Sequence, residues 1–158
     1  IPGTPHCEAC PLADRCLGYA AGRAGELPVK PAPKAKTTVP VTVALVESDA
    51  GLLLQRRPAK GLLAGLWQPA AWEKALTKDE LTAALAKLGV QATLTEPLPP
   101  AKHVFTHLIW EMEIHAFVAD APTDVPDGRW VNAAELAALP MPTAVKAARK
   151  FAEEALKA

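Results

Sequence analysis

The most informative segment of this sequence is Arg57-Pro58-Ala59-Lys60-Gly61-Leu62-Leu63-Ala64-Gly65-Leu66-Trp67. Its glycines and its early proline predict a loop, because both residue types favour turns over regular structure. The tryptophan that ends the stretch, together with Trp72 and Trp110, is expected to lie in the core or line a cleft, since aromatic side chains usually contribute buried area.

The residues before this loop predict a β-hairpin. Val41-Thr42-Val43-Ala44-Leu45-Val46 is rich in β-branched side chains, which favour strands. The turn residues Ser48-Asp49-Ala50-Gly51 separate it from a second strand, Leu52-Leu53-Leu54-Gln55-Arg56.

The residues after the loop carry helical signals at three places. Residues 77–89 predict a helix, since Thr77 and Glu80 form a capping box and a glycine ends the segment. Asn132 caps a short second helix. Pro142 marks the first turn of a final helix. The positions of that helix expected to face the core are Val145, Ala148, Phe151, Ala152 and Leu156.

Strand signals lie between these helices. Val104–Phe117 alternates over much of its length, which is typical of a half-buried strand, and residues 129–131 form a shorter strand. His115 falls on the polar face and is expected to be an ordinary surface residue. The prolines between residues 97 and 100 predict a loop that leads into the long strand. The order of elements predicts a mixed β-sheet with helices packed on its faces, an α+β or mixed α/β fold.

Composition limits the possible functions. The chain has 158 residues with 17 basic and 17 acidic side chains, so its formal net charge is zero. A neutral domain is not expected to bind nucleic acid through net charge alone. No run approaches the roughly 20 apolar residues that span a bilayer, and residues 1–4 lack the basic and apolar segments of a signal peptide.

The first 38 residues differ in composition from the rest of the chain. All three cysteines lie within residues 1–17. Residues 18–38 are rich in Gly, Ala and Pro with scattered positive charge, and the prolines between 28 and 34 predict an extended linker. Residues 39–158 are therefore expected to form the folded domain.

Cys7, Cys10 and Cys16 have the spacing C-x2-C-x5-C, which is typical of a metal site rather than of disulfides. Zinc, an iron–sulfur cluster and three unliganded thiols all stay open from the spacing alone. Three thiolates leave a tetrahedral site or a cubane cluster one ligand short. His6 is poorly placed to complete it, because it directly precedes Cys7.

This spacing resembles the C-x6-C-x2-C-x5-C motif that holds the 4Fe–4S cluster in the endonuclease III and MutY group of DNA glycosylases. The resemblance implies that residues 1–17 are the C-terminal end of a cluster-binding motif, with the fourth cysteine immediately before Ile1. It also implies an upstream helical domain that carries the catalytic carboxylates, so no catalytic residue is expected in this chain.

The loop of residues 57–67 resembles R-P-x-x-G-L-L-x-G-L-W in the C-terminal domain of the MutY family of adenine DNA glycosylases, a domain with a Nudix-like fold. The family often continues with x-Phe-Pro, whereas this chain has Gln68-Pro69-Ala70. The resemblance implies that residues 39–158 are a Nudix-like domain that recognises a DNA lesion.

The glutamates of a working Nudix hydrolase, which hold magnesium, have no counterparts in this sequence. Aligning the Nudix motif on Gly89-Val90 places Thr82 and Ala83 at its Arg-Glu pair, and Ala86 and Lys87 at its Glu-Glu pair. Because magnesium needs oxygen ligands, no magnesium-dependent Nudix site is expected.

His103-Val104-Phe105-Thr106-His107 resembles the H-x-F-S-H loop by which the MutY family recognises 8-oxoguanine opposite adenine. The resemblance implies that Phe105 packs near the lesion strand, that Thr106 presents its hydroxyl to the oxidised base, and that His107 supports the loop or meets phosphate. A hydroxyl suits this base edge because it both donates and accepts. Strand alternation alone places Thr106 on a half-buried strand, and that alternative stays open.

The resemblance implies a role in DNA repair, within an iron–sulfur enzyme that flips adenine out of an 8-oxoguanine:adenine mispair and hydrolyses its glycosidic bond. The expected partners are double-stranded DNA with that mispair, whose backbone the basic linker crosses, and the upstream helical domain. A monomer in the bacterial cytoplasm, associated with the nucleoid and not with a membrane, is expected. Two alternatives stay open, a Nudix hydrolase of oxidised nucleotides and a zinc-knuckle interaction module.

Overall fold

The computed structural model describes residues 4–32 and 34–156, and the chain divides into two compact units, residues 1–35 and residues 36–158. The first unit contains η1 (Ala13–Arg15), α1 (Leu17–Ala20) and η2 (Ala24–Glu26). Its described residues after η2 form no helix or strand, whereas the earlier part of the expected linker contains helical turns. Of the six residues between Cys7 and the expected fourth cysteine, residues 1–3 lie outside the described residues.

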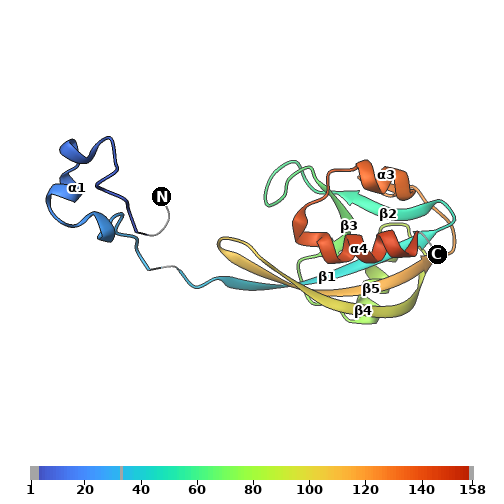
Figure 1. Cartoon of the computed structure of the whole chain (residues 1–158). Coiled ribbons are helices and arrows are strands. Elements are labelled where there is room, and N and C mark those ends of the chain that lie inside the picture. Colours follow the sequence, from blue (N-terminus) through green and yellow to red (C-terminus); the bar gives the residue numbers. More distant parts are fainter. Residues whose placement is uncertain (1–3, 33, 157–158) are drawn as a thin grey trace. The chain divides into compact units, whose positions relative to one another are not determined.

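The second unit is built on a six-stranded sheet in the order β4-β5-β1-β3-β2-β6 (Figure 1). Its strands are β1 (Thr37–Ser48), β2 (Gly51–Arg56), β3 (Trp67–Trp72), β4 (Ala92–Val104), β5 (Leu108–Ala119) and β6 (Gly128–Val131). β1 and β5 run parallel over their whole register, whereas the other paired strands are antiparallel. The predicted mixed sheet is confirmed.

The helices of this unit are α2 (Lys78–Lys87), α3 (Ala133–Ala138), η3 (Thr143–Val145) and α4 (Lys146–Ala155). Capping boxes start α2 at Thr77 and α3 at Asn132, as the sequence predicts. The last helix opens with the 3-10 turn η3 directly after Pro142. No helix in residues 4–32 or 34–156 combines the length and apolar character needed to cross a membrane.

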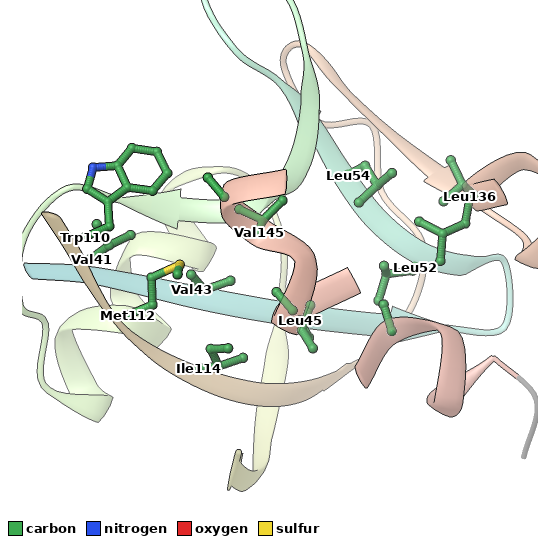
Figure 2. Close-up of a cluster of buried hydrophobic side chains, with 14 residues drawn as sticks. Val41, Val43, Leu45, Leu52, Leu54, Trp110, Met112, Ile114, Leu136 and Val145 are labelled. Carbon is green, nitrogen blue, oxygen red and sulfur yellow. The ribbon is translucent and has the colours of Figure 1, made fainter. Parts of the chain in front are cut away.

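Each face of the sheet has its own apolar core. One core joins alternate residues of β1, β2 and β5 to α3, η3 and α4, and Figure 2 shows Trp110 at one end of it and Leu136 near the other. The second core packs α2 through Leu81 and Leu85 against the opposite face. The core-facing positions predicted for the last helix all belong to the first core. Helices therefore cover both faces of the sheet.

The predicted hairpin of β1 and β2 is confirmed only at its turn. The two strands pair at Glu47–Leu52 and Ser48–Gly51, and beyond that point β3 lies between them. Gly51 has a φ of +110°, and a Cβ at this position would lie 2.2 Å from the carbonyl oxygen of Val131. Only glycine fits where the hairpin turn passes this close to the end of β6.

Two predictions for the β4–β5 region are wrong. The prolines between residues 97 and 100 lie within β4, an edge strand whose register shifts near Leu98, and not in a loop. An edge strand tolerates proline because one side of its backbone needs no ladder hydrogen bond. His115 is 9% exposed and buried, not on the surface. It shares a strand face with Phe117, which lies in the core beneath α2.

Candidate functional site

The residues 105–107 form the connection between β4 and β5. The Phe105 amide donates a 2.8 Å hydrogen bond to the carbonyl oxygen of Leu108, which closes the turn. Thr106 and His107 are exposed. The predicted loop is confirmed, and the alternative that Thr106 belongs to a half-buried strand is wrong. What this loop binds stays a prediction.

Phe105 anchors the loop to the domain. Its ring is half-buried and lies edge-on between the rings of His103 and Trp110, with centroid distances of 4.5 Å and 5.1 Å. Such edge-to-face pairs are favourable because a positive ring edge meets a negative ring face. Trp110 is 1% exposed, so the stack connects the exposed loop to the core. The structure thus brings His103 and Phe105 together and leaves Thr106 and His107 free to meet a ligand.

The beginning of β1 also holds this loop. The Lys36 ammonium donates a 2.7 Å hydrogen bond to the carbonyl oxygen of Phe105, and the Thr37 amide donates a 3.3 Å hydrogen bond to the carbonyl oxygen of His107. In the sequence Lys36 stands out only as linker charge, because its partner lies 69 residues further along the chain. No local pattern signals a contact at that separation.

Arg57 organises the loop that follows β2. Its guanidinium donates hydrogen bonds to the carbonyl oxygen of Leu62 at 2.8 Å, to Gln68 Oε1 at 3.2 Å and to Glu73 Oε1 at 2.9 Å. It also lies over the Trp110 ring, 5.4 Å from the centroid. A planar fork of donors can make all these contacts at once, which an ammonium group cannot. Arg57 therefore ties this loop to the residues that support Phe105.

The backbone of the same loop explains its glycines. Gly61, Leu63 and Gly65 have positive φ values of 100°, 57° and 71°. Glycine adopts such angles without strain, whereas leucine does so at a cost. Leu63 packs against the first core, and that burial offsets the cost.

A cavity of about 290 Å³ lies beside Arg57 and is lined by polar side chains, Gln68 and Glu73 among them. Trp110 also lines it, and the buried indole nitrogen of this residue has no hydrogen-bond partner in the described structure. The sequence does not mark Arg57 or Gln68 as site residues, although both stand in or next to the stretch that identifies the fold.

The outer surface of α2 lacks carboxylates at the positions where a Nudix hydrolase carries them. Ala83, Ala86 and Lys87 are exposed on this helix. The nearby Glu80 is occupied by the helix cap, where it accepts hydrogen bonds from the Thr77 amide and hydroxyl at 2.8 Å and 2.9 Å. These bonds, the one from the backbone first, lower the pKa of the Glu80 carboxyl below its ordinary value. Glu80 is thus a capping residue.

The three cysteines are free thiols, with Cys7 and Cys16 half-buried and Cys10 exposed. The Cys10 amide donates a 3.1 Å hydrogen bond to the carbonyl oxygen of Cys7, and Cys16 precedes α1. Sulfur donors suit iron or zinc. Within residues 4–32 and 34–156, however, no three Cys, His, Asp or Glu side chains are arranged to hold a metal ion. The thiols have the right chemistry for such a site, and the cluster stays a prediction.

The sequence between residues 41 and 150 matches the NUDIX domain family. The C-terminal domain of mouse MUTYH, solved in complex with human PCNA, is 24% identical with a TM-score of 0.59, covering 76% of this chain and 90% of that chain.

Two further solved structures share the fold. The MutT protein from Methanosarcina mazei Go1 is 12% identical with a TM-score of 0.59, and the match covers 79% of this chain and 99% of that chain. The E. coli ORF135 protein is 25% identical with a TM-score of 0.55, and the match covers 78% of this chain and 93% of that chain.

Proposed function

The chain belongs to the NUDIX domain family, and from that premise we propose that it recognises 8-oxoguanine in DNA as part of an adenine DNA glycosylase. In this proposal the parent enzyme removes adenine opposite 8-oxoguanine with a helical domain that is not part of residues 39–158. In the same proposal the parent enzyme acts as a monomer in the bacterial cytoplasm, at the nucleoid. The expected Nudix-like fold is confirmed, whereas the role of the chain in recognising 8-oxoguanine is proposed.

The geometry of residues 103–107 carries the proposal. Phe105 is held by two aromatic rings, while Thr106 and His107 project from the same turn and are exposed. A rigid turn that presents a hydroxyl and an imidazole can address a base edge that both donates and accepts hydrogen bonds. This arrangement suits the oxidised edge of guanine, where N7 has become a donor beside a new carbonyl oxygen.

The surface of α2 supports recognition over hydrolysis. A MutT-like hydrolase of oxidised nucleotides is the second candidate, favoured by the family match and by the shared fold of the MutT protein. Magnesium-assisted hydrolysis needs carboxylates near the diphosphate. The exposed Ala83, Ala86 and Lys87 offer none. The C-terminal domain of mouse MUTYH shows that this fold also occurs as one domain of a larger protein.

Duplex binding by the 158-residue chain tests the lesion role. The unaltered chain should prefer a duplex with 8-oxoguanine opposite adenine over the same duplex with guanine opposite adenine. Thr106→Ala should lower that preference about fivefold, since one hydrogen bond contributes about 1 kcal/mol. Thr106→Ser keeps the hydroxyl and should keep the preference. An equal preference in all three proteins would show that the loop does not bind the oxidised base.

Nucleotide hydrolysis separates the two candidates. The chain should show no turnover of 8-oxo-dGTP in the presence of magnesium, because α2 provides no ligand set for the metal. Clear turnover would favour the hydrolase and contradict the proposal.

In the same proposal, Cys7, Cys10 and Cys16 hold a 4Fe–4S cluster of the parent enzyme together with one further cysteine. Metal analysis of the parent enzyme tests this part separately. Iron together with the visible absorbance of an iron–sulfur cluster is the expected result. Stoichiometric zinc without iron would instead favour a zinc-knuckle interaction module.

A further inference from the structure

An open groove of about 670 Å³ runs between β4 and α4. Lys102 and His103 of the edge strand line one side of it, and residues 143–153 of η3 and α4 line the other. Its floor includes the apolar side chains of Met112 and Ala144, which are buried in the first core. The groove is therefore bounded by β4 on one side and by η3 and α4 on the other.

Charge distinguishes this groove from the chain as a whole. The chain is neutral, with 17 basic and 17 acidic residues. The groove is lined by the basic residues Lys102, Lys146, Arg149 and Lys150 and by a single acidic residue, Glu153. Glu153 pairs with Arg149 at 2.8 Å. Beyond that pair the lining carries three lysines and no further carboxylate, which favours an anionic ligand.

Two of these lysines, Lys102 and Lys150, have acidic partners but remain available to bind a ligand. Lys102 pairs with Glu111 at 3.2 Å and Lys150 with Glu154 at 3.7 Å, and all four of these side chains are more than half exposed, from 56% to 74%. Exposed pairs of this kind contribute little, because water and salt screen them. A ligand with a higher density of negative charge can therefore displace these carboxylates.

The groove is continuous with the 103–107 turn. His103 lines the groove, and its ring lies 4.5 Å from that of Phe105. On α4, Lys146 and Lys150 are four residues apart, about 6 Å along the helix axis. Two lysines at this separation can contact neighbouring phosphates of one DNA strand.

We propose that this groove binds backbone phosphates of the DNA strand next to the recognised base, through Lys102, Lys146 and Lys150. The inference rests on the proposed function and adds a second binding surface to it. Phosphate contacts fix the position and register of a protein on DNA without reading sequence. The groove would thus supply affinity for any duplex, while Thr106 supplies preference for the lesion.

The test is the salt dependence of duplex binding by the full 158-residue chain, starting at low salt of about 50 mM. The groove variant replaces Lys102, Lys146 and Lys150 by glutamine. The control variant makes the same replacement at Lys60, Lys78 and Lys87, which are exposed outside the groove and change the net charge equally. Thermal unfolding of both variants verifies that the fold is kept.

The groove variant should bind an 8-oxoguanine:adenine duplex at least about tenfold more weakly than the unaltered chain at low salt. Its plot of log affinity against log salt should be shallower by about 0.9 for each phosphate that the variant no longer neutralises. The ratio of affinities for 8-oxoguanine:adenine and guanine:adenine should not change. The control variant should retain most of the affinity and the slope.

Three results would overturn the inference. The first is an equal reduction of duplex affinity in the groove variant and the control variant. The second is no measurable duplex binding by the unaltered chain at low salt. The third is a groove variant that no longer binds polyglutamate, which stands for an acidic protein segment, but keeps its affinity for the duplex. The last result would assign the groove to an acidic protein segment. Failure of the lesion role is separate, because it appears as an unchanged base preference in Thr106→Ala.

Discussion

Lys36 Nζ donates a 2.7 Å hydrogen bond to the carbonyl oxygen of Phe105, 69 residues further along the chain. The bond joins the residue before β1 to the turn between β4 and β5. It continues the parallel pairing of β1 with β5, whose register begins at Thr37 and Leu108. The conformation of the 105–107 turn therefore depends on where the chain enters the sheet.

Loss of this bond should loosen the turn without unfolding the domain. Lys36→Met should accelerate hydrogen exchange of the Phe105 amide, which closes the turn. The free energy of unfolding should change by less than about 1 kcal/mol, because the bond is exposed. Lys30→Met, a change of the same kind in the linker, is the control. Identical exchange in the two variants would mean that Lys36 does not hold the turn.

Replacement of Arg57 should destabilise the domain strongly. Arg57→Lys keeps the charge but cannot donate to Leu62, Gln68 and Glu73 together. Because the side chain is only 13% exposed and Gln68 is buried, we expect a loss of about 2–3 kcal/mol in urea unfolding. Lys60→Ala, at an exposed position in the same loop, should have almost no effect. Comparable losses in both variants would contradict this role of Arg57.

Gly51→Ala should be among the most damaging single substitutions. The added Cβ would lie 2.2 Å from a backbone oxygen, so β2 and β6 would have to separate. We expect a loss of more than about 3 kcal/mol by chemical denaturation. Gly61→Ala is a matched control, since its φ is +100° but no atom beyond the adjacent residues lies within 4 Å of the added Cβ. That variant should lose only the cost of the backbone angle, about 1–2 kcal/mol. Similar losses for both would show that the backbone angle, and not the close approach, dominates at Gly51.

The start of α2 should make stability depend on pH. The pKa of the Glu80 carboxyl is lowered in the folded chain by hydrogen bonds from Thr77, so the ionised form stabilises the fold. This stabilisation is fully present above the ordinary value of 4.5 and is lost as the pH falls through the lowered folded value. Glu80→Gln should therefore be less stable than the unaltered chain at neutral pH, and the gap should shrink in acid. Asp79→Asn serves as the control, and a gap independent of pH would refute this origin.

Much of the fold could be predicted from local patterns. The capping boxes at Thr77 and Asn132 depend on residues three positions apart, so sequence alone reveals them. The face of β5 that carries Trp110 and Met112 follows from alternation. The full extent of β4 could not be predicted because its prolines signal a loop, and only its place at the sheet edge makes them acceptable. The burial of His115 could not be predicted either, because no pattern within the strand shows where α2 packs.

Residues 103–107 of the candidate site also combine features that the sequence reveals with features that only the tertiary structure sets. Sequence by itself determined which side chains are available: an aromatic ring, a hydroxyl and two imidazoles, and no carboxylate at the Nudix positions on α2. Tertiary structure decided that Thr106 stands in a turn and not in a strand, that Phe105 is held by Trp110 and Lys36, and that lysines of β4 and α4 share one groove. The physical reason is the sequence separation over which each kind of interaction acts. Chain stereochemistry and capping act within a few residues, whereas sheet register and packing join residues that are far apart in sequence.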